Sequence, residues 1–243
     1  MEQPLTSRYD DAVETTDPVI DLLEDLRPQP YALVRTDQIA NPIVEPQWGG
    51  VRVLAAVEDG SVALRDDEGQ PFTERPEVDR ALGGAVLARS AILDGYLTKQ
   101  PTGEIVYTEP PTDTPSVSAF IAKPFIGIRR DRLQETKDYD AHLAEEATFR
   151  EDDRVAFVAV DLLRLDGDSL LDVPLLERKR LLDSVVTPSD LVRVGAYVRP
   201  PLQTWISTWR RLGFVGLSYR AANSRYHPGE EHGDWTLIPM PRR

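Results

Sequence analysis

Two strand-like segments of the chain are joined by Val44-Glu45-Pro46-Gln47-Trp48-Gly49-Gly50-Val51-Arg52. The chain becomes strand-like at Ile43, and an apolar run occupies residues 51–57. Asp59-Gly60 favours a tight hairpin turn, so we expect a returning strand at residues 61–65. This part of the sequence therefore predicts an antiparallel hairpin.

The rest of the chain shows the periodicities of further strands and helices. Strands are predicted at residues 91–97, 104–108, 155–163, 192–198, 214–219 and 234–240. Helices are predicted at residues 19–26, 130–149, 174–185 and 202–212. Strands outnumber helices, which is typical of an α+β fold with antiparallel β-sheets flanked by helices. We expect an N-terminal arm and short helix over residues 1–30, and one domain over residues 31–243.

Composition limits the class of protein. The chain has 243 residues, of which 41% are hydrophobic and 28% charged, enough for one good core or two small ones. It has no run of eighteen apolar residues, so no membrane span is expected. The polar, acidic N-terminus is not a secretory signal, and we therefore expect a cytoplasmic protein. The absence of cysteine excludes disulfides and thiolate metal sites.

The net charge of −13 argues against nucleic acid as a partner. A surface with this charge repels a phosphate backbone unless basic residues cluster on one face. The arginines available for such a patch are Arg129, Arg130, Arg132, Arg210, Arg211, Arg242 and Arg243. Lysine is scarce, with only Lys99, Lys123, Lys137 and Lys179 in the whole chain. We expect weak or absent DNA binding, and a protein as the more suitable partner for the acidic surface.

Five motifs resemble, in order, those of the adenylation (nucleotidyltransferase) domain of ATP-dependent DNA ligases. They are Glu45-Pro46-Gln47-Trp48-Gly49-Gly50-Val51-Arg52, Leu93-Asp94-Gly95-Tyr96-Leu97, residues 157–167 with Pro174-Leu175-Leu176-Glu177-Arg178-Lys179, Val215-Gly216-Leu217-Ser218-Tyr219-Arg220, and residues 224–229 with Gly233-Asp234-Trp235. The resemblance covers roughly residues 31–240 and implies the ATP-grasp-like fold of that domain. The sequence ends just after the last motif, so we expect no C-terminal OB-fold of the kind with which ligases clamp DNA.

Glutamine stands at the position of the family's nucleophile. In the family, the first motif reads Glu-Pro-Lys-Trp-Asp-Gly, and its lysine attacks the α-phosphate of ATP to form a lysyl-adenylate. Here the residue is Gln47, whose amide nitrogen is not nucleophilic because its lone pair is delocalised into the carbonyl. The resemblance therefore implies a catalytically degenerate domain without a catalytic residue. The alternative interpretation of Gln47 is simply a polar residue in a solvated cleft.

Other positions that the family uses are changed as well. Tyr96 and Val215 stand where glutamates hold the ribose or the metal, and Arg220 stands where a lysine contacts phosphate. Leu237 and Pro239 replace two phosphate-binding lysines, and the proline limits its strand to an edge or terminus. The turn at residues 66–69 carries three acids where the family has an arginine. The resemblance thus implies a vestigial nucleotide-binding set and no metal ligands; the set is Glu45, Gln47, Trp48, Arg52, Tyr96, Val215 and Arg220.

Three charged residues of the motifs are retained. They are Arg52, Asp94 and Asp161, which match polar residues of the family. They also have a purely structural interpretation, in which Asp94-Gly95 forms a turn at a strand end and Asp161 caps a helix or pairs with an arginine. We favour this structural interpretation.

Three functional hypotheses follow from the sequence. The first is a pseudoenzyme, a ligase-type adenylation domain kept as a binding or regulatory module, possibly in DNA repair. The second is an active ATP-dependent DNA ligase or nucleotidyltransferase of repair and recombination that uses another lysine, such as Lys99 or Lys123. The third is a nucleotide sensor that binds without reacting. No cofactor is expected under the first, whereas ATP and magnesium would bind if residual binding survives.

Overall fold

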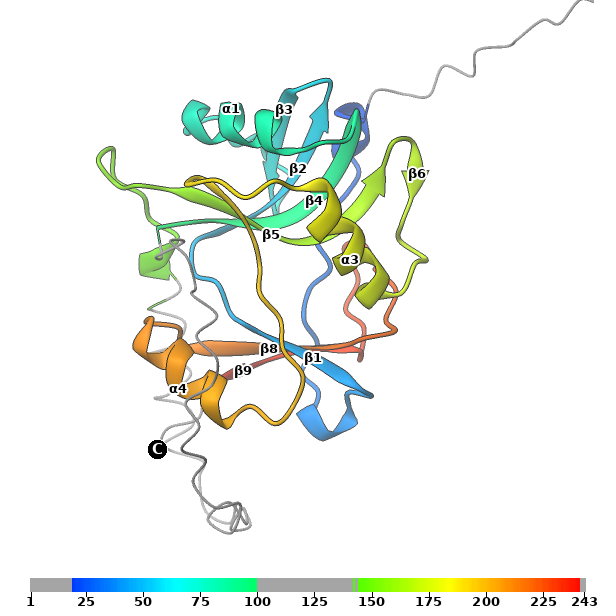
Figure 1. Ribbon diagram of the computed structural model, residues 1–243, viewed down its shortest axis with the longest axis vertical. Coiled ribbons are helices and arrows are strands. Elements are labelled where there is room, and N and C mark those ends of the chain that lie inside the picture. Colours follow the sequence, from blue (N-terminus) through cyan, green and yellow to red (C-terminus); the bar gives the residue numbers. More distant parts are fainter. Residues whose placement is uncertain (1–18, 100–141, 143, 241–243) are drawn as a thin grey trace, which may run out of the picture.

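The computed structural model describes residues 19–99, 142 and 144–240, which form two β-sheets with helices packed against them (Figure 1). Within these residues the larger sheet has six strands, with the order β3-β2-β4-β5-β6 and with β7 also paired to β5. Its strands are β2 (Val51–Glu58), β3 (Ser61–Asp66), β4 (Ser90–Thr98), β5 (Ala156–Leu165), β6 (Asp168–Ser169) and β7 (Val192–Val194). The smaller sheet has the order β1-β8-β9 and consists of β1 (Pro42–Pro46), β8 (Gly216–Ala221) and β9 (Trp235–Pro239).

The predicted hairpin is confirmed as β2–β3. The two strands pair in antiparallel register up to Glu58 opposite Ser61. Asp59 and Gly60 have φ angles of 48° and 80°, the left-handed conformation that a two-residue turn of this type requires. The antiparallel α+β class is confirmed too, with β7 against β5 as the parallel exception.

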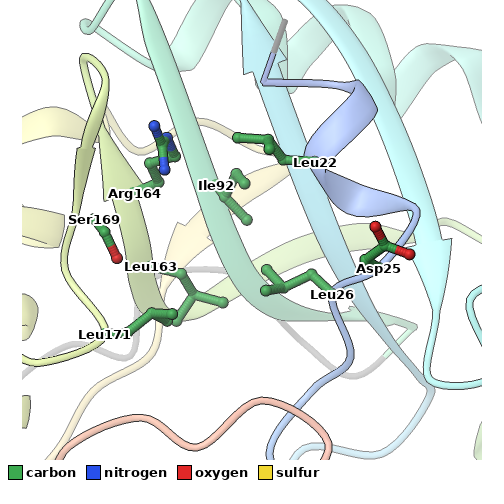
Figure 2. Close-up of a pocket in the computed structure, with 8 residues that line it drawn as sticks. All are labelled: Leu22, Asp25, Leu26, Ile92, Leu163, Arg164, Ser169 and Leu171. Atoms are coloured by element: carbon green, nitrogen blue, oxygen red, sulfur yellow. The ribbon is translucent and has the colours of Figure 1, made fainter. Parts of the chain in front are cut away.

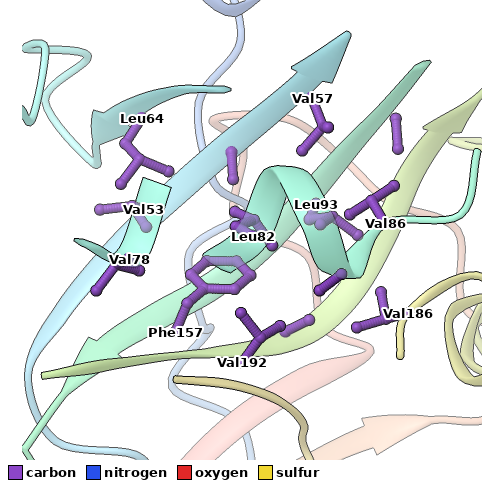
Figure 3. Close-up of a cluster of buried hydrophobic side chains, with 14 of the residues drawn as sticks. Val53, Val57, Leu64, Val78, Leu82, Val86, Leu93, Phe157, Val186 and Val192 are labelled. Carbon is purple, nitrogen blue, oxygen red and sulfur yellow. The ribbon is translucent and has the colours of Figure 1, made fainter. Parts of the chain in front are cut away.

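One face of the larger sheet carries the main hydrophobic core. Helix α1 (Pro76–Ala85) lies over this face, and Figure 3 shows Val78 and Leu82 of the helix directed at the sheet. Because side chains alternate along a strand, Val53 of β2 points to this core while Leu54 points to the opposite face. The core also receives Phe157 of β5, which is fully buried.

The opposite face of the larger sheet is covered by two different layers. The segment before β1 contributes Val19 and Leu23, which pack with Leu54, so the N-terminal residues from 19 onward belong to the same packed body. The other layer is the smaller sheet, with α3 (Leu175–Val185) between the sheets at one side and α4 (Gln203–Arg211) beside β8 and β9 (Figure 1). The space between the two sheets is where the motif residues meet.

Several local predictions were wrong. Residues 19–26 do not form an α-helix; only a 3-10 turn, η1 (Asp21–Leu23), is present, because one turn suffices to bury Leu23 and so short a helix gains little by itself. Asp94-Gly95 is not a turn but the middle of β4. Helix α1 was not predicted, although Pro76 at its first position and the acidic first turn are helix-start signals.

Other predictions differ from the structure in extent or cannot be compared with it. A second 3-10 turn, η2 (Thr36–Gln38), precedes β1. The strand expected at residues 192–198 is reduced to β7 plus one isolated bridge between Val44 and Val198. Most of the predicted helix at residues 130–149 and the predicted strand at residues 104–108 lie outside the described residues.

Candidate functional site

Strand β1 leads directly into Gln47, which sits at the edge of the space between the sheets. Its backbone N–H donates to the carbonyl oxygen of Gly216 at 2.9 Å, and its side-chain amide donates to the carbonyl oxygen of Trp48 at 3.2 Å. Gln47 is 7% exposed, so it is not the solvated cleft residue of the alternative interpretation. The chain then passes β4 so closely that a Cβ atom on Gly50 would lie 1.9 Å from the carbonyl oxygen of Leu97. Glycine at this position lets β2 begin beside β4.

Trp48 and Tyr96 lie in one buried apolar cluster. Trp48 packs edge-to-face on Phe214, with ring centroids 4.9 Å apart, and the cluster extends to Trp209 of α4. Trp48 and Tyr96 are 4% and 6% exposed. Val215, in contrast, is half-buried and stands outside this cluster within the described residues, and its carbonyl oxygen accepts a bond from the Met240 N–H. Trp48 and Tyr96 of the vestigial nucleotide-binding set are therefore joined in one apolar cluster, and Val215 is not part of it.

A cluster of buried charges connects the two sheets with α3. Glu45 of β1 accepts hydrogen bonds from Lys179 of α3 and from Arg220 of β8, one on each carboxylate oxygen. Asp161 of β5 receives a bidentate pair from Arg178, with both N···O distances 2.8 Å. Arg220 also approaches Asp161 at 3.5 Å, so the Glu45 and Asp161 pairs form one network, which we call the inter-sheet ion cluster. Every member of it is at most 2% exposed.

A second ion pair lies beside this cluster. Arg52 of β2 binds Asp94 of β4 in a bidentate arrangement, with N···O distances of 3.0 and 2.6 Å. The Tyr226 hydroxyl donates to the same carboxylate at 2.8 Å and accepts from the Gln29 N–H. Asp94 is therefore fully partnered inside the fold, although from the middle of a strand and not from the turn that the structural interpretation expected.

Burial and neighbouring charges act in opposite directions on the pKa values of Lys179, Arg220 and Asp161. Burial lowers the pKa of Lys179, although the Glu45 carboxylate opposes this effect. Burial acts against the charge of Arg220 as well, but Glu45, Tyr31 and Asp161 outweigh it and raise its pKa. Burial would raise the pKa of Asp161, yet Arg178 and Arg220 hold it below its ordinary value. Each of the two carboxylates is thus paired within the protein, while the three cations leave the cluster with one positive charge in excess.

The donor set does not suit ATP and magnesium in the way the family binds them. Glu45 and Asp94, the acids of the first two motifs, already accept from arginine, lysine or tyrosine. The described residues contain no group of three or more His, Asp or Glu side chains placed to hold a metal ion. Gln47 offers only an amide. Among the described residues, the acids of the first two motifs are thus already paired within the protein.

The remaining motif positions also have structural roles. In the acidic turn, Asp66 accepts from the N–H groups of Glu68 and Gln70, at 3.0 and 2.7 Å, and so stabilises the turn itself. Pro239 ends β9, an edge strand of the smaller sheet, as its sequence position predicted. Of the predicted set, Glu45 and Arg220 are brought together, as are Trp48 and Tyr96.

Sequence reasoning missed Lys179 and Arg178 as partners of the motif acids. Both residues belong to the third motif, where they were interpreted only as matches to the family pattern and were given no partner. Lys179 is 134 residues from Glu45 in sequence. The available signal was the presence of two cations in the middle of a predicted amphipathic helix. Lysine and arginine are rarely fully buried without a partner, so this position indicates that acids lie nearby.

The fold and the motif order identify the family. Residues 29–238 match the ATP dependent DNA ligase domain, and the chain belongs to this family. The sequence is 27% identical over 192 residues to the multifunctional non-homologous end joining DNA repair protein LigD of Mycobacterium tuberculosis H37Rv. The matched region covers 79% of this chain and 20% of LigD. It is 29% identical over 208 residues to a DNA ligase of Methanothrix thermoacetophila, covering 80% of this chain and 31% of that protein. The chain thus spans about a fifth to a third of the length of these relatives.

Solved structures agree with this fold. The ligase domain of M. tuberculosis LigD superposes with a TM-score of 0.60 and 22% identity, over 89% of this chain and 60% of that domain. A mycobacterial DNA ligase D complexed with ATP and MES gives a TM-score of 0.59 at 22% identity, over 88% of this chain and 60% of the other. In the described part of the present chain, no helix is both long and apolar enough to cross a bilayer.

Proposed function

We propose that this chain is a ligase-type adenylation domain that does not form a lysyl-adenylate and acts as a binding module. The observation that carries the proposal is Gln47 at the nucleophile position, because an amide cannot attack a phosphate. The pairing of Glu45 with Lys179 and Arg220 supports the proposal, because these charged groups are already bound to one another inside the fold. The name of the LigD relative suggests DNA repair as its setting. The net charge of −13 favours a protein as the partner.

The two lysines among the described residues, Lys99 and Lys179, offer little support for a substitute nucleophile. The Lys99 ammonium donates to the carbonyl oxygens of Glu145 and Thr148, on the surface of the domain. Lys179 lies in the inter-sheet ion cluster, fully buried and paired with Glu45. A reactive amine needs both a free lone pair and room for the α-phosphate beside it. Lys123 lies outside the described residues.

The test is the intact mass of the protein after incubation with ATP and magnesium. We expect the mass to stay unchanged in the wild type and in Gln47→Lys, because the single restored lysine still lacks metal and phosphate ligands. The matched control is Gln70→Lys, which adds a lysine on an exposed turn away from the site. Gain of one acid-labile adenylyl group by the wild type would overturn the proposal, and peptide mapping would then name the lysine used.

A further inference from the structure

The segment before β1 places an aromatic side chain among the residues of the first two motifs. The Arg52 guanidinium carbon lies 5.4 Å from the ring centre of Tyr31 and 6.0 Å from that of Tyr96. Both distances are within the range of cation–π interactions. Tyr31 was not part of the predicted set, because it lies outside the five motifs.

The contacts of Tyr31 continue into the smaller sheet. Its ring packs against Trp235 of β9, with ring centroids 5.8 Å apart, and the Arg220 guanidinium carbon lies 4.8 Å from the Trp235 ring. Trp235 and Arg220 are at most 1% exposed. A series of contacts, which we call the aromatic–arginine stack, thus joins the two sheets through Tyr96, Arg52, Tyr31, Trp235 and Arg220.

The Tyr31 hydroxyl lies close to the vestigial nucleotide-binding set. Burial raises its pKa well above the ordinary value, and the titratable groups that also act on this pKa are Tyr96, Arg220, Arg52 and Glu45. All four belong to that set. Tyr31 as a whole is only half-buried, so its ring extends from this buried end towards solvent. Removal of the ring would therefore open the space to the outside.

The backbone on both sides of Tyr31 is held independently of its side chain. The Gln29 carbonyl oxygen accepts from Arg52 at 2.8 Å, and the Ala32 N–H donates to the carbonyl oxygen of Trp235 at 3.0 Å. Shortening Tyr31 should therefore empty part of the inter-sheet space without releasing the segment that carries it.

Two buried donors at the stack have no hydrogen-bond partner within the described residues. They are the Nε atom of Arg220 and the side-chain amide nitrogen of Gln29, a residue that is 0% exposed. An unmade hydrogen bond in a buried place is unfavourable, and a tyrosine ring offers these donors no acceptor. A ligand with several acceptor atoms would suit them better.

We propose that Tyr31 blocks nucleoside binding, because its ring occupies the space between Arg52 and Trp235 in which the motif residues would otherwise hold a nucleoside. This inference rests on the proposed function, since a chain that forms a lysyl-adenylate must admit ATP. A nucleobase is planar and stacks on aromatic rings and on guanidinium groups, so it would use the contacts that the Tyr31 ring now makes. Its acceptor atoms would meet the two unpaired donors.

A separate cavity of about 240 Å³ does not provide this site. Figure 2 shows its lining, which is mainly aliphatic and includes Leu22, Ile92 and Leu163. None of the five residues of the aromatic–arginine stack lines it. It is also smaller than the roughly 300–1,000 Å³ that is usual for ligand pockets.

Calorimetric titration of the full-length protein with adenosine tests the proposal. Tyr31→Ala should bind adenosine at least about tenfold more tightly than the wild type, the effect expected from one base stacking on an aromatic surface. The NMR signal of the Trp235 indole N–H should shift on binding to Tyr31→Ala, whereas the methyl signals of Ile92 in the separate cavity should not. Because adenosine has no phosphate, it cannot adenylate the protein, and its binding is independent of the intact-mass result for Gln47.

Three further variants make the outcome decisive. Tyr31→Phe keeps the ring and should bind no better than the wild type. Leu33→Ala shortens a fully exposed side chain of the same segment and should also gain nothing. Tyr31→Val removes the ring with a smaller loss of packing, and serves if the alanine variant does not fold. Saturable binding by the wild type as tight as by Tyr31→Ala would overturn the proposal, as would folded Ala or Val variants that gain no binding.

Discussion

Glu45 holds two cations that come from two different elements of the fold. Lys179 lies on a helix and Arg220 on a neighbouring strand, and both lose their water shell on folding. Removing water from a charge costs several kcal/mol, which only a well-placed counter-charge offsets. The glutamate of the first motif is thus the acceptor that pairs both cations inside the fold.

Neutralising this carboxylate should be costly. Glu45→Gln keeps the size of the side chain but leaves Lys179 and Arg220 without their counter-charge, so we expect a loss of about 3–5 kcal/mol of unfolding free energy. Chemical denaturation of the purified protein measures it. Glu177→Gln is the control, because Glu177 pairs with Arg180 on the surface at 2.6 Å, a type of pair worth at most about 1 kcal/mol. Equal effects of the two variants would contradict a special role for Glu45.

The ionisation of Asp161 makes the free energy of unfolding depend on pH in the acidic range. Its folded pKa lies below the ordinary value of 3.8, because Arg178 and Arg220 outweigh the effect of burial. A carboxylate whose pKa is lower in the folded than in the unfolded protein contributes its full stabilisation above pH 3.8. This contribution disappears as the pH falls through the pKa of the folded state. Denaturation midpoints measured at pH 7, 4 and 3 should therefore fall more steeply for the wild type than for Asp161→Asn. Parallel slopes would exclude this residue as a source of acid sensitivity.

At the scale of elements, sequence patterns predicted what is local. The β2–β3 hairpin follows from a two-residue turn and an apolar run, and α3 follows from its 3.6-residue periodicity. An arginine partner for Asp161 was among the expectations, but the partners in the ion pairs could not be identified from local patterns, because they are 17 to 175 residues apart. Helix η1 shows the reverse case, in which a good local pattern yields to packing against β2.

The contact between β4 and β5 depends on a glycine. A Cβ atom on Gly95 would lie 2.5 Å from the ring of Phe157 and 2.6 Å from the carbonyl oxygen of Val158. Gly95→Ala should therefore destabilise the protein by about 1–3 kcal/mol through overpacking. Gly84→Ala, in the exposed last turn of α1 with no atom within 4 Å of the new Cβ, should stabilise it by roughly 0.5–1 kcal/mol. Thermal unfolding of both variants measures the direction of each change in stability. A loss of stability in both variants would refute the packing argument.

At the scale of the whole molecule, net charge governs which partners approach. A charge of −13 opposes a polyanion, although screening over about 8 Å at physiological salt limits this effect to short range. The arginines at residues 129–132 lie outside the described residues, whereas Arg211 ends α4. The acids of the turn at residues 66–69 add to the repulsion.

Titration with nicked duplex DNA tests this expectation. By fluorescence anisotropy at physiological salt we expect no saturable complex below about 10 μM, within the range of roughly 1–100 μM that is usual for non-specific binders. The charge-reduced variant Asp67→Asn/Glu68→Gln should bind no more than marginally better. Tight, salt-sensitive binding that is lost in Arg129→Ala/Arg130→Ala would instead identify a DNA-docking module.

The smaller sheet draws its strands from distant parts of the chain. Strand β1 ends at Pro46, and its partner β8 begins at Gly216. During translation, β1 therefore emerges with unpaired backbone hydrogen-bonding groups. About 170 further residues must be synthesised before its partner strand exists. The β2–β3 hairpin, in contrast, can form as soon as both of its strands have been synthesised. Closing so long a loop is slow, and an unpaired strand edge is prone to aggregate. We therefore expect the segment from β1 to Gln47 to be among the last described parts of the domain to become native during synthesis.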